Sequence, residues 1–125
     1  MTDALNEPPS CKVVERIPRG SASVHTLSSA HLGCVGINGA LACPDDAKSI
    51  RRGCVRRRAA SQQALRQRLE RAQREEDLLA TADSATRASF VMAVSQGMAV
   101  QAKGGASRKA LERMAVYVLS TWPFY

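Results

Sequence analysis

Residues that could bind a metal or act as nucleophiles are few and widely spaced in this sequence. Its four cysteines contain no C-x-x-C pair, and its two histidines, His25 and His31, add no zinc-ligand spacing. Serines are numerous, but no nucleophile elbow, P-loop, dinucleotide fingerprint or paired-histidine helix accompanies them. The GINGA segment at 36–40 is a weak glycine pattern that follows no expected strand. The sequence therefore predicts neither an enzyme nor a metal or cofactor site.

Arginines are the second group with possible chemistry. Nine of them fall between residues 51 and 74 and account for much of the net charge of +7. Clustered arginines can neutralise phosphates, which raises the hypothesis of a basic helical nucleic-acid binder. However, no aromatic residues alternate with them to stack on bases, and Glu70, Glu75, Glu76 and Asp77 interrupt the run. We therefore favour a solvated helix face, which is the usual role of such charge runs.

The elements that must position any site are expected to be helices. Aromatic residues are 4% of the chain, and Ala, Leu, Arg, Gln and Glu dominate its second half, which favours an all-α fold. A chain of 125 residues suffices for one domain. No apolar run is long enough to span a bilayer, and MTDALNEPPS has no signal-peptide character. We expect a cytoplasmic protein without a membrane partner.

The most informative stretch covers residues 84–122. Asp83 or Ser84 can cap a first helix, Gly104 and Gly105 can end it, and Ser107 can cap a second. The second helix has one apolar stripe, whereas apolar residues occur almost all the way round the first. Such a helix must be covered on more than one side. A second copy of the chain and a monomeric bundle explain this pattern equally well.

The rest of the chain gives weaker signals. Residues 1–12 read as an irregular lead-in, and Pro18 predicts that a helix around residues 11–27 is short, kinked or frayed. The apolar segment 34–43 fits a buried helix or a strand. Residues 44–46 form a good helix start, and a long helix is expected from there to about residue 79.

Residues 13–123 resemble the C-terminal regulatory domain of a TetR (tetracycline-repressor) family transcriptional regulator. The residues that carry the resemblance are VERIPRGSAS, the Gly33-Cys34 step into VGINGALAC, RRRAASQQALRQRLERAQREEDLLATAD, and FVMAVSQGMAVQAKGGASRKALERMAVYVLSTWP. The resemblance implies a helical domain at 13–125 that binds a small effector in an apolar pocket. It also implies that the last two helices form a four-helix bundle with their copies in a homodimer.

Two sets of candidate site residues follow from this reading. We expect a pocket for a small apolar or amphipathic effector to be lined by His31, Cys34, Asn38, Phe90, Val94 and Met98. We expect the dimer surface to contain Met92, Gln96, Ala99, Met114, Tyr117, Val118 and Thr121. Methionine and phenylalanine at helical spacing also serve as ordinary core residues, which is the competing interpretation.

Members of that family carry an N-terminal helix-turn-helix head, and nothing in MTDALNEPPSCK resembles a recognition helix. The sequence is thus expected to contact DNA only through a head that it lacks, as a truncation, an excised domain or a natural headless protein. The leading hypothesis is an effector-binding and dimerisation domain of TetR type. The alternatives are a headless module that heterodimerises with a full regulator, and the basic nucleic-acid binder.

Overall fold

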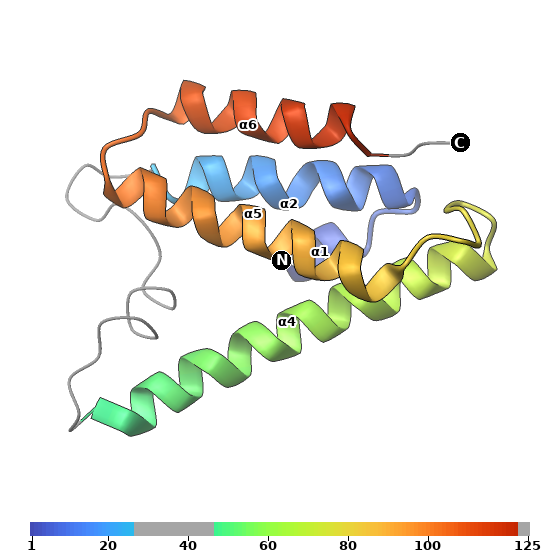
Figure 1. The fold of residues 1–125 in the computed structure, drawn as a ribbon, viewed down its shortest axis with the longest axis horizontal. Coiled ribbons are helices and arrows are strands. Elements are labelled where there is room, and N and C mark those ends of the chain that lie inside the picture. The colour runs from blue at the N-terminus through green and yellow to red at the C-terminus, as the bar shows by residue number, and fades with distance from the viewer. Residues whose placement is uncertain (27–46, 123–125) are drawn as a thin grey trace.

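The computed structural model describes residues 1–26 and 47–122, and the regular secondary structure of these residues is helical throughout (Figure 1). The elements are α1 (Thr2–Leu5), α2 (Ser10–Val24), α4 (Lys48–Arg74), α5 (Ser84–Lys103) and α6 (Arg108–Ser120). The predicted all-α class is therefore confirmed for this part of the chain. The expectations for residues 34–43 and 44–46 lie outside the described residues. None of the described helices combines the length and the apolar character that a bilayer crossing requires.

Helix α2 organises the bundle. It lies between α5 and α6 and packs extensively against both, while α4 crosses on the other side of α5 beside α1 (Figure 1). The last two helices make only limited contact with each other. They are consecutive helices joined by a glycine turn, as predicted, but α2 supplies most of the surface that α6 packs on.

Local hydrogen bonds set the start of α5 and of α6. The Asp83 carboxylate accepts a hydrogen bond from the Thr86 N–H at 3.0 Å and another from the Thr86 hydroxyl at 2.6 Å. These bonds lower the pKa of Asp83, with the side-chain bond as the largest cause. The Ser107 hydroxyl accepts from the Ala110 N–H at 3.2 Å. Asp83 and Ser107 are thus the N-caps, as expected from the sequence.

Helices α4 and α5 end in the same way. After α5, Gly105 adopts a φ of 99°, and the Ala106 N–H donates to the Gln101 carbonyl at 3.0 Å. After α4, Glu76 adopts a φ of 60°, and the Asp77 N–H donates to the Ala72 carbonyl at 2.9 Å. Both are Schellman motifs, in which a left-handed residue lets the chain turn back on the last helical carbonyls. The predicted stop at Gly104 and Gly105 is confirmed, whereas the stop after Arg74 uses a glutamate.

Helix α2 differs from its prediction. It runs through 15 residues, and Pro18 lies inside it, fully buried. Proline has no N–H to donate to the carbonyl four residues earlier, so the helix loses one internal hydrogen bond there. Burial of Val13, Val14, Ile17 and Ala22 against the rest of the bundle offsets that loss. Residues 1–12, expected to be irregular, include α1 and the first residues of α2.

Two apolar clusters form the core. The larger joins residues of α1, α2, α4 and α5 with Leu78, Ala82 and Trp122, and it includes Leu65, Leu69 and Ala72 of α4. The smaller one joins Ala22, Met98, Ala102 and Leu111 at the other end of α2. Helix α4 ends at Arg74, before the predicted end near residue 79, and buries residues only in its second half. There Arg68 is 5% exposed, so the expectation of a solvated arginine was wrong at this position.

Candidate functional site: a cavity and an apolar groove on opposite sides of α5

A cavity of about 350 Å³ lies between α2, α4 and α5, with α1 at its edge. Most of its lining is apolar, from residues such as Ile17, Val24, Met92 and Ala99. This volume is within the range of small-molecule sites in proteins. Its full described lining consists of Met1, Ala4, Arg16, Ile17, Gly20, Ser21, Val24, His25, Arg58, Met92, Ser95, Gln96 and Ala99.

Two polar atoms in this lining are buried without a hydrogen-bond partner among the described residues. They are Nε of Arg58, from α4, and the hydroxyl oxygen of Ser95, from α5. Ser95 is 8% exposed. A buried polar group without a partner costs stability, on the order of 1–3 kcal/mol, so such groups call for an explanation. Here the two residues line the same cavity.

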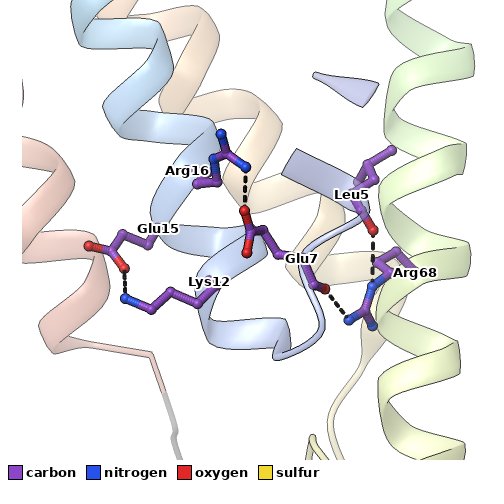
Figure 2. Close-up of polar contacts among 6 residues, drawn as sticks. All are labelled: Leu5, Glu7, Lys12, Glu15, Arg16 and Arg68. Atoms are coloured by element: carbon purple, nitrogen blue, oxygen red, sulfur yellow. Dashed lines mark hydrogen bonds and ion pairs between the residues drawn. The ribbon is translucent and has the colours of Figure 1, made fainter. Parts of the chain in front are cut away.

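Helix α1 is held at the edge of the cavity by Arg68 of α4 (Figure 2). The Arg68 guanidinium donates to the Leu5 carbonyl at 3.2 Å, to the Glu7 carbonyl at 2.8 Å and to the Pro8 carbonyl. Burial lowers the pKa of Arg68, and the neighbouring charge of Arg71 adds to this effect. Glu7 also pairs with Arg16 of α2. These contacts tie the segment that follows α1 to both α2 and α4.

The segment between α4 and α5 is fixed in a similar way. The Gln73 amide donates to the carbonyls of Leu79, Ala80 and Ala82 at 3.1, 3.2 and 2.6 Å, and its oxygen accepts from the Ser84 hydroxyl at 2.7 Å. The Asp77 carboxylate accepts from the Ser10 N–H at the start of α2. The start of α2, the end of α4 and the start of α5 are therefore linked by hydrogen bonds.

A second concave surface lies on the other side of α5. This groove, of about 560 Å³, is lined by Phe90, Val94 and Gly97 of α5 and by Ala110, Arg113, Met114, Tyr117 and Val118 of α6. We call it the α5/α6 groove. Phe90 is 45% exposed and Tyr117 71%, so large apolar surface is uncovered here. Val100 and Val116 are also half exposed on these two helices.

The structure distributes the predicted pocket residues over three places. Phe90 and Val94 line the α5/α6 groove, and Met98 is fully buried in the smaller core cluster. His31, Cys34 and Asn38 lie outside the described residues. None of the three described residues lines the cavity between α2, α4 and α5.

The predicted dimer residues divide between the two sides of α5. Met114, Tyr117 and Val118 line the α5/α6 groove, and Thr121 is the exposed C-cap of α6. Met92, Gln96 and Ala99 instead line the cavity. At about 100° per residue, positions 92, 96 and 99 lie opposite positions 90, 94 and 97.

Most of the described cavity residues were not predicted to line a pocket, although their spacing is regular. Ile17, Gly20, Ser21 and Val24 on α2 follow the i, i+3, i+4, i+7 pattern, as do Met92, Ser95, Gln96 and Ala99 on α5. Small and polar residues within each stripe distinguish these faces from a closely packed core. Arg58 gives no comparable signal, because it is one of many arginines on its helix.

The first half of α4 remains a basic surface. Arg51, Arg52, Arg56 and Arg57 are exposed, as predicted for a solvated face, and Ile50 and Val55 are exposed beside them. Cys11 and Cys54 are free thiols. Across residues 1–26 and 47–122, no three metal-binding side chains are grouped as a metal site would require.

Comparison with known proteins places this fold. No family model and no curated protein matches the sequence. Two solved structures of the TetR family transcriptional regulator CifR match it with a TM-score of 0.86 and 28% and 27% sequence identity. Both are cysteine mutants in complex with 26 bp double-strand operator DNA.

The match covers 97% of this chain and 64% of the CifR chain, so the sequence spans slightly less than two thirds of its structural neighbour. The neighbours are transcriptional regulators, not enzymes. The five described helices, with a cavity and an apolar groove on opposite sides of α5, thus form a structure closely similar to part of a TetR family transcriptional regulator.

Proposed function

We propose that this chain is the effector-binding and dimerisation domain of a TetR-type transcriptional regulator. In this assignment the cavity between α2, α4 and α5 binds a small effector, and the α5/α6 groove packs against a second copy. Phe90 and Val94 then belong to the dimer surface, and Met92, Gln96 and Ala99 belong to the effector site. Their positions in the lining of the groove and of the cavity support this assignment.

The observation that carries the proposal is that one helix borders both sites. Met92, Ser95 and Ala99 of α5 line the cavity, while Phe90 and Gly97 of the same helix line the groove. Large exposed apolar residues next to a groove are typical of a surface covered by a partner. A helix covered by its own chain on one side and by a partner on the other also accounts for its nearly continuous apolar sequence.

This arrangement gives a route for regulation. An effector can change the balance between two dimer arrangements only if it binds one of them more tightly. Because α5 borders both sites, a shift of α5 that improves contacts in the cavity would also move Phe90, Val94 and Gly97 in the dimer surface. DNA binding would require a head domain, which we place outside these 125 residues.

Solution mass tests the dimer surface directly. We expect light scattering of the wild type to give a mass near twice 13.5 kDa. Tyr117→Glu and Phe90→Glu each place a charge in the largely apolar groove and are expected to give monomers, because that charge must lose its hydration before the surfaces can associate.

Val55→Glu is the matched control. It adds the same charge at an exposed valine of α4, outside the groove, and should leave the dimer intact. A monomeric wild type, or dimers that survive both groove variants, would contradict the proposed interface.

A further inference from the structure

Two buried polar groups in residues of the cavity lining bear on the chemistry of the proposed effector. In a cavity with mostly apolar walls, Nε of Arg58 and the hydroxyl of Ser95 are buried and have no hydrogen-bond partner among the described residues. One is a cationic N–H donor and the other can donate or accept. Ser95 is more than nine-tenths buried, so bulk water does not readily satisfy its hydroxyl. Both residues line the cavity, which makes a bound molecule the candidate partner of these two groups.

Charge strengthens the case for an anion. No aspartate or glutamate is among the described lining residues. Arg16, also in the lining, forms an ion pair with Glu7, whereas Arg58 forms none with the residues that the structure describes. Among the residues that the structure describes, no carboxylate pairs with the Arg58 guanidinium in the cavity wall. Guanidinium groups bind carboxylates through directed, charge-assisted hydrogen bonds.

The remaining lining indicates the shape of the rest of the ligand. Ile17, Val24, Met92 and Ala99 offer only apolar contacts. A volume of about 350 Å³ holds about a dozen groups of the size of a water molecule at liquid density. That is enough for a charged group and a short aliphatic body, and such a ligand would bury most of its apolar surface.

We propose that the effector is an amphipathic monoanion, a carboxylate with an aliphatic body, whose charged end binds Arg58 and Ser95. This inference rests on the proposed effector role of the cavity and specifies the ligand class. The aliphatic body lies against Ile17, Met92 and Ala99. The anion accepts hydrogen bonds from Nε–H of Arg58 and from the hydroxyl of Ser95, and it neutralises the charge of Arg58.

Two probes of equal chain length test the inference. Octanoate carries the proposed charge near neutral pH, and 1-octanol is its neutral counterpart. Calorimetric titration of the full chain, with both probes kept below the concentration at which they aggregate, should give at least tenfold tighter binding of octanoate. Methyl NMR locates the site, since Met92 lines the cavity, Met98 lies in the smaller core cluster and Met114 lines the α5/α6 groove. Octanoate should shift the Met92 methyl signal most.

Variants assign the anion contact. Arg58→Met should reduce octanoate affinity about tenfold or more, through the lost charge-assisted bonds, and leave octanol affinity nearly unchanged. Arg58→Lys should restore part of the loss, and Ser95→Ala should give a smaller one. Arg57→Met is the matched control, because Arg57 is an exposed neighbour on α4 outside the cavity lining. It should bind octanoate like the wild type.

The outcomes separate this inference from the proposed function. If octanoate and octanol bind with equal affinity and both shift the Met92 methyl signal, the anionic ligand class is overturned. The proposal that the cavity binds an effector is then retained. Equal losses of octanoate affinity in Arg57→Met and Arg58→Met would mean that the net charge of the chain, and not a contact with Arg58, determines binding. That result would overturn the proposed contact. Binding of neither probe, or a shift of Met114 in place of Met92, would overturn both the inference and the effector role of the cavity. The dimer measurement is independent of all these results.

Discussion

Arg68 illustrates how a single residue can serve a structural role that its neighbours do not share. It belongs to a run of arginines, yet its guanidinium is buried and donates to the carbonyls of Leu5 and Glu7 (Figure 2). It also donates to the Pro8 carbonyl. Arg71, three residues on, is exposed and pairs with Glu75 at 3.5 Å. Residue type alone does not separate these two environments.

Replacement of Arg68 should therefore destabilise the fold. Arg68→Met keeps much of the apolar stem but leaves the carbonyls of Leu5, Glu7 and Pro8 without their donor. We expect a loss of about 2–3 kcal/mol in the free energy of unfolding, measured by urea denaturation. Arg71→Met, the control, should change it by less than about 0.5 kcal/mol, as is usual for exposed ion pairs. Equal effects of the two variants on the free energy of unfolding would show that the hydrogen bonds of Arg68 to these carbonyls do not stabilise the fold.

Asp83 predicts a specific dependence of stability on pH. Its hydrogen bonds with Thr86 lower its pKa in the folded chain. A carboxylate with a lowered folded pKa contributes its full stabilisation above its ordinary pKa of about 4 and loses it as the pH falls through the folded value. Asp83→Asn keeps a capping oxygen but does not titrate.

The melting temperature of the wild type should exceed that of Asp83→Asn near neutral pH. That difference should shrink as the pH is lowered below about 4, because the wild-type carboxylate becomes protonated. A difference that stays constant from neutral to acid pH would show that the charge at position 83 does not stabilise α5.

At the scale of elements, α2 and α5 each carry a glycine in mid-helix. A Cβ added at Gly20 or at Gly97 would meet no atom of the described residues within 4 Å. Glycine inside a helix lowers stability by up to about 1 kcal/mol relative to alanine. Both glycines therefore destabilise their helices, although the described part of the chain leaves room for a Cβ at each position. Gly97 lies in the α5/α6 groove, where a partner helix could approach closely.

The pair of alanine variants tests that explanation. Gly20→Ala should raise the free energy of unfolding by about 0.5–1 kcal/mol and leave self-association unchanged. Gly97→Ala should give a similar gain for the monomer but weaken the dimer, because its Cβ would enter the interface. Sedimentation over a range of concentrations measures the second effect. Unchanged association in Gly97→Ala would mean that no partner approaches α5 closely at this residue.

At the scale of the whole molecule, the fold places two sites of different character on opposite sides of α5. The cavity is bordered by α2 and α4, which α5 contacts extensively, and the α5/α6 groove faces away from them. The contacts of Arg68, Gln73 and Asp77 link the ends of these helices across the bundle. A ligand bound in the cavity, as we propose, would act on helices whose ends are already linked, which suits transmission of a small movement to the groove.

Much of this architecture could be predicted from the sequence because it depends on local interactions. Asp83 and Ser107 accept hydrogen bonds from residues three positions later, and Gly105 turns the chain at the end of its own helix. The all-α class and the apolar residues around α5 follow from composition and period, which are also local properties. The likeness to TetR regulators rests on such segments, and the structural match supports it.

Which side of α5 meets which neighbour was decided only by the tertiary structure. Period alone placed residues 90, 94 and 98 in one set and 92, 96 and 99 in another, but it did not say which set faces α2 and α4. That choice depends on contacts between residues far apart in the chain, such as Arg68 with Glu7 across 61 positions. The burial of Pro18 and Arg68, and the meeting of Arg58 with Ser95 in one cavity, have the same origin. Local sequence sets helix ends and faces, whereas long-range packing determines what each face contacts.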